Sequence, residues 1–118
     1  MEQITEDLIF DTIMESARGK VDYAAFEALF PFNPDNFLSS IIYGFALGTP
    51  IEVIVGRIAT QVNMTGNTVD QQSLMIFIED NTPLIAEEVK AKQVVLRMLD
   101  DGDELEDIYK VVAGMLGL

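Results

Sequence analysis

The sequence contains no histidine, no cysteine and no tryptophan. Without histidine and cysteine, the chain cannot build Ser-His or Cys-His catalytic pairs, and it cannot form disulfides or zinc sites of the ordinary ligand type. Helix-bundle di-iron sites based on Glu-x-x-His are excluded for the same reason. No glycine-rich phosphate-binding loop ending in Gly-Lys-Ser/Thr is present. These absences predict a protein without catalytic residues and without a cofactor or a metal.

Basic residues are scarce. Seven Lys and Arg stand against 20 Asp and Glu, which gives a net charge of −13. Affinity for nucleic acid comes from cations that neutralise phosphates, and an anionic membrane surface repels an acidic chain. We therefore expect no direct nucleic-acid binding and no membrane binding, but a protein partner with a basic surface. The alternative is that the charge serves only to keep the protein in solution.

Long apolar runs are also missing. No run approaches the ~20 residues that span a bilayer, and the first seven residues lack the basic and apolar regions of a signal peptide. Together with the lack of disulfides, this predicts a cytoplasmic protein, in the host cytoplasm if the chain is viral. The 118 residues, of which 49% are hydrophobic, suit one domain with one core. We predict a single all-α domain over residues 1–118, a compact bundle of six or seven short helices arranged as helical hairpins.

Capping residues and glycines mark the first two helices. Thr5 is expected to cap a helix that begins with two acidic residues and ends at Gly19. Asp22 is expected to cap a short second helix over Tyr23–Leu29. The pattern predicts a helical hairpin at the start of the chain.

Proline marks the start of three later helices. Pro34 and Pro50 are expected at the first helical position, Pro50 behind a Thr49 cap, and Thr82-Pro83 is expected to open the sixth helix. Gly48 and Gly102 are expected to end the third and sixth helices.

The remaining boundaries rest on weaker signals. Thr68 and Asp103 are the expected caps of the fifth and seventh helices. The run Leu74–Ile78 is continuously apolar, so it fits either a helix or a buried strand, and we favour a helix because its neighbours are helical. Gly44 and Gly56 fall inside predicted helices, where a close helix–helix crossing would offset their cost.

Aromatic residues gather around two prolines in the first third of the chain. Phe30, Phe32 and Phe37 are candidates for an apolar partner-binding surface, with Phe32 expected to be the most exposed because it lies between two helix breakers. The alternative is that these rings pack the short second helix onto the bundle.

Two groups of acidic residues are candidates for an acidic partner-binding surface. Asp7, Asp11 and Glu15 recur every four residues, so they share one helix face. The second group surrounds the turn between the last two helices and comprises Asp100, Asp101, Asp103, Glu104 and Asp107. Acids at a helix N-terminus also favour the helix macrodipole, which accounts for part of this group without any function.

The second group also offers a metal-binding hypothesis. Glu104-x-x-Asp107 resembles one half of the paired motif with which all-helical nucleotide pyrophosphohydrolases hold Mg²⁺. The other half is missing, because Glu87 is followed three residues later by Lys90. The resemblance implies a magnesium-dependent hydrolase as the third of three functional readings.

The first reading is a small acidic, non-catalytic protein–protein interaction protein, such as an adaptor, an assembly factor or an inhibitor, which acts through an apolar or aromatic patch and an acidic surface. The second is a nucleic-acid mimic, comparable in composition to viral inhibitors, because carboxylates one helical turn apart are ~6 Å apart, close to the phosphate repeat of a nucleic-acid strand. Since short helices with Ile- and Val-rich faces leave apolar surface uncovered, a homodimer or a hetero-complex is also expected.

Overall fold

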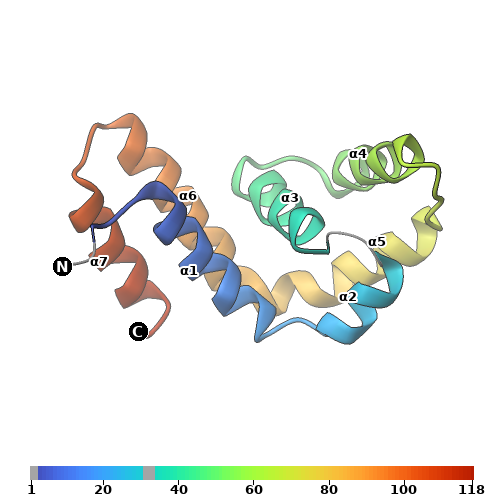
Figure 1. Cartoon of the computed structure of the whole chain (residues 1–118), viewed down its shortest axis with the longest axis horizontal. Helices are drawn as coiled ribbons and strands as arrows, with labels where there is room; N and C mark the ends of the chain where they lie inside the picture. The colour runs from blue at the N-terminus through green and yellow to red at the C-terminus, as the bar shows by residue number, and fades with distance from the viewer. Residues whose placement is uncertain (1–2, 31–33) are drawn as a thin grey trace.

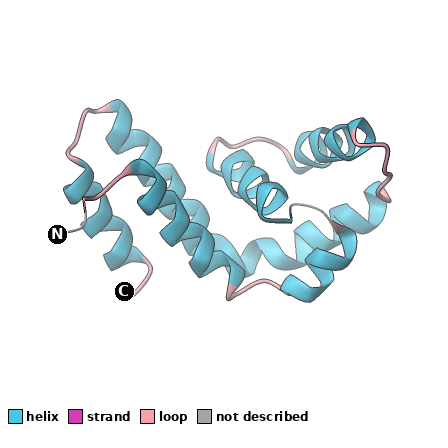
Figure 2. Ribbon diagram, viewed as in Figure 1, coloured by secondary structure: helices cyan, strands magenta, loops and turns pink. Residues whose placement is uncertain are grey.

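The computed structural model describes residues 3–30 and 34–118, and every regular element in those residues is helical (Figure 1, Figure 2). In chain order, the elements are α1 (Glu6–Arg18), α2 (Tyr23–Leu29), α3 (Pro34–Ala46), α4 (Ile51–Met64), α5 (Gln71–Asn81), the short 3-10 helix η1 (Thr82–Ile85), α6 (Ala86–Asp100) and α7 (Leu105–Met115). The predicted all-α helical bundle is confirmed. The strand alternative for Leu74–Ile78 is wrong, because the segment lies inside α5.

The buried side chains form two clusters, although the sequence suggested one core. The larger cluster joins the end of α1 to α2, α3, α4, α5 and η1, and the smaller cluster joins α1, α6 and α7. Figure 1 shows the two groups of helices at opposite ends of an elongated molecule, whose extents are 43 × 26 × 25 Å. Two clusters form because helices of 7 to 15 residues are too short to surround a single centre.

The helices α5, η1 and α6 follow one another without a loop and run along both halves of the molecule (Figure 1). The sequence predicted a break at Thr82, with this residue as a cap. Instead, the Thr82 hydroxyl donates a hydrogen bond back to the carbonyl oxygen of Ile78. Pro83 lacks a backbone N–H, and the chain responds with one tight 3-10 turn before α6 begins.

Two of the predicted caps are confirmed by their hydrogen bonds. The backbone N–H of Leu8 donates to Thr5 Oγ1 over 3.1 Å, and that of Ala25 donates to Asp22 Oδ1 over 3.2 Å. Gly102 follows the end of α6 with φ of 80°, a left-handed conformation that favours glycine. Gly19 ends α1 with φ of −74°, so this position does not require glycine.

Three other helix starts differ from the prediction by one or two residues. Pro50 is the cap residue of α4 and Glu104 is that of α7, and neither helix has a side-chain cap. At α5 the cap is Asp70, whose carboxylate accepts hydrogen bonds from the Gln72 N–H and the Ser73 hydroxyl. These bonds, with that from Ser73 the larger cause, lower the pKa of Asp70. Thr49 and Asp103 lie one residue before the observed cap positions, and Thr68 lies two residues before Asp70, which is within the usual uncertainty of a helix boundary.

The two helical glycines differ in their surroundings. A Cβ atom at Gly44 would lie 2.9 Å from both Cδ1 and Cγ1 of Ile54, whereas one at Gly56 would meet nothing within 4 Å. The predicted close helix crossing is therefore confirmed at Gly44, where α3 meets α4, and it is wrong at Gly56.

The pair of glycines gives a matched test of this crossing. We expect Gly56→Ala to raise the free energy of unfolding by up to about 1 kcal/mol, because alanine favours the helix and has free space. Gly44→Ala should lower it by about 1 kcal/mol, since the new methyl group overpacks the buried Ile54. Urea denaturation of both variants measures the difference. Equal stabilisation by the two substitutions would show that the crossing is loose.

A buried carboxylate connects α1 to α6. The Glu88 side chain is fully buried. Its Oε1 accepts a hydrogen bond of 2.7 Å from the Ser16 hydroxyl and forms an ion pair with Lys20 Nζ over 2.5 Å. Its Oε2 has no hydrogen-bond partner within residues 3–30 and 34–118. Because an unpaired buried charge is costly, the Lys20 ammonium is the group that makes this buried carboxylate tolerable.

We expect Lys20→Met to lower the free energy of unfolding by about 3 kcal/mol, because the substitution leaves the Glu88 carboxylate buried without a counter-charge. Adding Glu88→Gln should recover part of this loss, since the neutral amide needs no counter-ion. Lys110→Met, which removes an exposed cation on α7, is the control for the change in net charge. A Lys20→Met variant as stable as this control would contradict the role given to the pair.

Candidate interaction surfaces

The aromatic residues suggested as partner contacts are part of the larger core. Phe30 and Phe37 are 0% and 6% exposed, and their rings stack with centroids 4.4 Å apart. The Phe26 ring contacts Phe30 on one side and Phe77 of α5 on another, at centroid distances of 4.9 and 5.2 Å. For Phe30 and Phe37 the structure bears out the alternative reading, in which these rings pack the short second helix onto the bundle, so they are not surface contacts for a partner. Phe32 lies outside the described residues.

The acidic residues of α1 form one exposed row. Asp7, Asp11 and Glu15 are all exposed, on the side of the helix opposite the buried Ile9 and Ile13. Glu15 is eight residues beyond Asp7, about 12 Å further along the helix axis. The shared face that the sequence predicted is confirmed.

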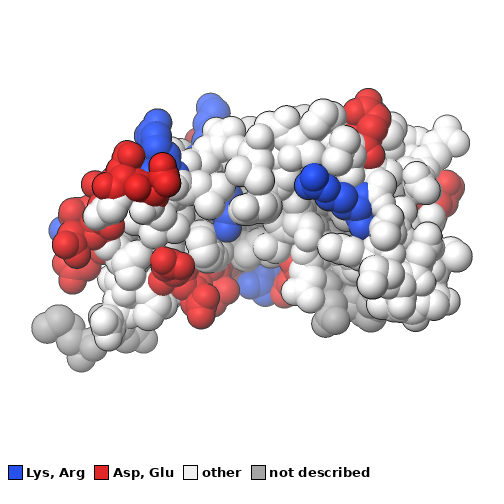
Figure 3. Space-filling view, turned by 90° about the horizontal axis from the view of Figure 1, so that it is seen from above, with Lys and Arg blue, Asp and Glu red and all other residues white. Residues whose placement is uncertain are grey.

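The second acidic group lies at the same end of the molecule as the start of α1. The five acids of the α6–α7 turn are exposed, and α1 runs antiparallel to α6, as the contact between Ser16 and Glu88 requires. Figure 3 shows acidic side chains gathered at the end formed by α1, α6 and α7. We call this surface the acidic end, and it comprises Asp7, Asp11, Asp100, Asp101, Asp103, Glu104 and Asp107.

Closeness of acids at this end does not amount to a metal site. Within the described part of the chain, no group of three or more acidic side chains is arranged to hold a metal ion. The carboxylates of Glu104 and Asp107 are thus without the further ligands that Mg²⁺ requires from a protein or substrate. The geometry gives no support to the hydrolase reading.

A groove between α2, α5 and η1 was not evident from the sequence. Its apolar lining consists of Ala25, Ala28, Leu29, Ile76, Phe77 and Leu84, and its polar lining consists of Asp22, Ser73, Asp80 and Asn81. Ile76 and Leu84 are 52% and 51% exposed, and both line this groove, where a partner can cover them. The groove has a volume of about 610 Å³, enough for several side chains of a partner. We call this surface the α2–α5 groove.

The walls of the α2–α5 groove are fixed to each other. The backbone N–H of Asp22 donates to Asn81 Oδ1 over 3.2 Å, and Asn81 Nδ2 donates to the carbonyl oxygen of Phe77 over 2.9 Å. The buried Asn81 amide therefore ties the start of α2 to the end of α5. A groove with fixed walls binds a partner at a lower entropic cost than one that must form on binding.

The α2–α5 groove carries acidic but no basic residues. Asp22 and Asp80 line it, and the helices that form it contain no Lys or Arg. A sequence signal existed for this feature, because Arg57 is the single basic residue between positions 21 and 89. The pattern showed a long stretch of the chain with one cation, but the pairing of α2 with α5 comes only from the fold.

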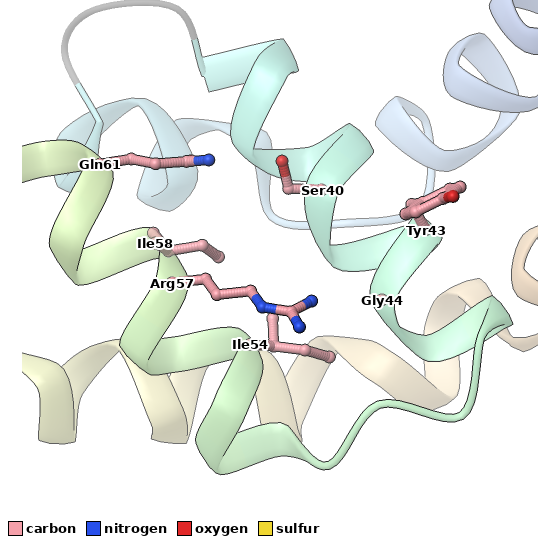
Figure 4. A pocket seen from close by; sticks show the side chains of 7 residues that line it. All are labelled: Ser40, Tyr43, Gly44, Ile54, Arg57, Ile58 and Gln61. Atoms are coloured by element: carbon pink, nitrogen blue, oxygen red, sulfur yellow. The ribbon is translucent and has the colours of Figure 1, made fainter.

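A smaller pocket of about 180 Å³ lies between α3 and α4 (Figure 4). We call it the α3–α4 pocket, and it is lined by Ser40, Tyr43, Gly44, Ile54, Arg57, Ile58 and Gln61. Figure 4 shows the side chains of Arg57 and Gln61 extending from α4 toward α3. The close crossing at Gly44 and Ile54 lies beneath them, so the pocket has an apolar base and polar groups around it.

A second cation lies beside Tyr43. The Lys92 ammonium is 3.4 Å from the centroid of the Phe10 ring and 5.6 Å from that of Tyr43, and burial lowers the pKa of Lys92. No ion pair joins Lys92 to an acid in the part of the chain that the structure describes. The aromatic faces provide the attraction that a carboxylate would otherwise supply.

Among residues 3–30 and 34–118, no helix has both the length and the hydropathy of a membrane span. No protein-family model, curated protein or solved structure matches this chain.

Proposed function

We propose that this chain is a non-catalytic protein-interaction protein, acting as an adaptor, an assembly factor or an inhibitor, whose α2–α5 groove receives an amphipathic helix with basic residues along its edges. The observation that carries the proposal is the groove itself, with apolar residues along its length, acids lining it and no cation in its helices. Such surfaces bind partners in the helix-in-groove manner, in which residues at i, i+3, i+4 and i+7 serve as anchors.

The apolar residues of the groove serve affinity, and its acidic residues serve the orientation of the partner helix. Half-exposed Ile76 and Leu84 can be covered by apolar anchors of the partner helix, and buried apolar anchors supply most of the energy of such interfaces. Asp22 and Asp80 can pair with Lys or Arg beside those anchors, which speeds encounter and fixes the direction of the helix. The net charge of −13 attracts a basic partner from a distance.

A second copy of the chain suits the groove less well than a basic partner. In a two-fold dimer through this surface, Asp22 and Asp80 would face the same acidic groups of the other copy, and like charges at an interface oppose association. Homodimer formation stays a prediction from the apolar surplus of the sequence. Light scattering at high protein concentration measures it, and a 13.1 kDa monomer would refute it.

The groove is tested by charge substitution at its apolar residues. We expect Ile76→Asp and Leu84→Asp each to weaken partner binding at least tenfold, because each places a carboxylate where an apolar anchor is buried. The partner is first isolated by affinity capture from the native cells and mass spectrometry, and its affinity for the purified variants is then measured by calorimetry.

The matched control for these variants is Val111→Asp. Val111 is an apolar residue on α7 that is 40% exposed, in the other half of the molecule. The same change of charge at this position should leave partner binding intact. If Ile76→Asp and Leu84→Asp bind the partner as well as Val111→Asp does, the α2–α5 groove is not the binding surface.

The acidic end supports nucleic-acid mimicry as a second candidate function. Acids on α1 and in the α6–α7 turn converge at one end of the molecule although they are about 90 residues apart in sequence, with α1 acids repeating once per turn (Figure 3). A surface of this kind can occupy the basic site of a DNA- or RNA-binding protein.

If the mimic reading is correct, the combined substitution Asp7→Asn, Asp11→Asn and Glu15→Gln should weaken binding to the captured partner at least tenfold. The affinity of the wild-type protein should also fall steeply between about 50 and 300 mM salt, because salt screens exposed charges. Glu27→Gln with Glu79→Gln, which neutralises exposed acids of the other half, is the control. An affinity that barely changes with salt would count decisively against mimicry.

A further inference from the structure

Arg57 has an unusual position for a cation in such an acidic chain. The residues three and four positions away from it on α4 are Val53, Ile54, Thr60 and Gln61, none of which is acidic. Every other Lys or Arg inside a helix has an Asp or Glu at one of these positions, where i,i+3 and i,i+4 ion pairs form. With 20 acids available, the sequence leaves this one helical cation without a neighbour of opposite charge.

The fold does not provide Arg57 with a partner either. Within the described residues, its guanidinium makes no ion pair and no hydrogen bond. The Gln61 side-chain amide, which lines the same pocket and extends toward α3 as Arg57 does (Figure 4), also makes no hydrogen bond within the described residues. The α3–α4 pocket therefore presents a guanidinium and an amide that have no acceptor, and a guanidinium fork fits the two oxygens of a carboxylate.

Apolar surface surrounds these donors. Val53 and Met64 lie on the same face of α4 as Arg57, and they are 42% and 82% exposed. Tyr43 on α3 is 46% exposed and lines the pocket. A ligand that places a carboxylate on Arg57 would therefore cover apolar side chains on both sides of it.

The electrostatic surroundings of the pocket also favour an anion. Lys92 Nζ lies 5.6 Å from the centroid of the Tyr43 ring, so the side chain that lines the pocket has cations near it from two helices, α4 and α6. Neither cation is neutralised by an acid in the described part of the chain. The lining of the pocket contains one cation, Arg57, and no acid, although the chain has a net charge of −13.

We propose that the α3–α4 pocket binds the carboxylate of an acidic side chain in a partner polypeptide, with apolar residues next to that acid packing on Tyr43 and Val53. The volume of about 180 Å³ fits one Asp or Glu side chain and is below the ~300 Å³ at which pockets for small-molecule ligands begin. The exposed apolar residues around the pocket extend the contact surface, so that residues of the peptide on either side of the acid can pack on them. This site differs from the α2–α5 groove in its helices and in the sign of its charge, so the two proposals can fail separately.

The test is a titration of the ¹⁵N-labelled full chain, followed by NMR, with the blocked peptide acetyl-Ala-Leu-Glu-Leu-Ala-amide. We expect saturable shifts of the Arg57 Nε–H and the Gly44 amide, and at least tenfold weaker binding of the same peptide with Gln in place of Glu. Free glutarate is titrated in parallel. If glutarate binds as tightly as the peptide, the ligand is a small organic acid and the polypeptide assignment is overturned.

Two variants identify the residue responsible. Arg57→Gln should fold normally, because Arg57 is exposed and pairs with no described residue, and it should bind the Glu peptide at least tenfold more weakly. Lys110→Gln removes the same charge from an exposed position on α7 and should bind the peptide as the wild type does. The absence of saturable shifts, equal binding of the Glu and Gln peptides, or unchanged binding by Arg57→Gln would each overturn the proposal.

Discussion

The continuous segment of η1 and α6 contributes to both hydrophobic clusters, and the buried Glu88 carboxylate lies between the residues that belong to each. Ile85, just before α6, belongs to the larger cluster, and Ala91 and Val95 belong to the smaller one. Glu88 lies between them and bonds to Ser16 on α1 and to Lys20 in the turn that follows. A polar contact therefore holds α1 to α6 where the two halves meet, and its hydrogen bond and ion pair have stricter geometry than apolar packing alone would impose. It adds to the apolar packing of α3 on α6, which also joins the two halves.

The two halves differ in how they use charge. Six of the seven basic residues lie outside residues 21–86, where they accompany most of the acids. Outside residues 21–86, the Glu88 carboxylate pairs with Lys20, and Glu87 Oε1 lies 4.0 Å from Lys90 Nζ. The half built from α2 to α5 contains Arg57 as its single cation, so each of its charges acts with little local compensation. A charge near apolar surface without a neighbour of opposite sign costs free energy, and it is useful for recognising a partner. We therefore place both proposed binding sites in this half.

The sequence predicted what depends on neighbouring residues and missed what depends on distant ones. The Asp22 cap and the end of α6 at Gly102 were correct, because a cap and a left-handed glycine act within one helical turn. The exposed row on α1 was correct for the same reason. For Phe30 and Phe37 the sequence left a surface role and a packing role both open, since the choice depends on contacts with α5, about 40 residues later. The α2–α5 groove likewise depends on distant contacts, among them the packing of Phe26 on Phe77 and the hydrogen bond from the Asp22 N–H to Asn81 across 59 positions.

The two proposed binding sites of the α2-to-α5 half have no lining residue in common. They nevertheless share a core, because α4 packs against α5 through buried Ile58, Val62, Leu74 and Ile78. A chain that takes a basic helix in one site and an acidic segment in the other would bring two partners of opposite charge together, which is the task of an adaptor. Any coupling between the sites must be reciprocal, so a ligand that strengthens binding in the groove must itself bind more tightly when the groove is filled.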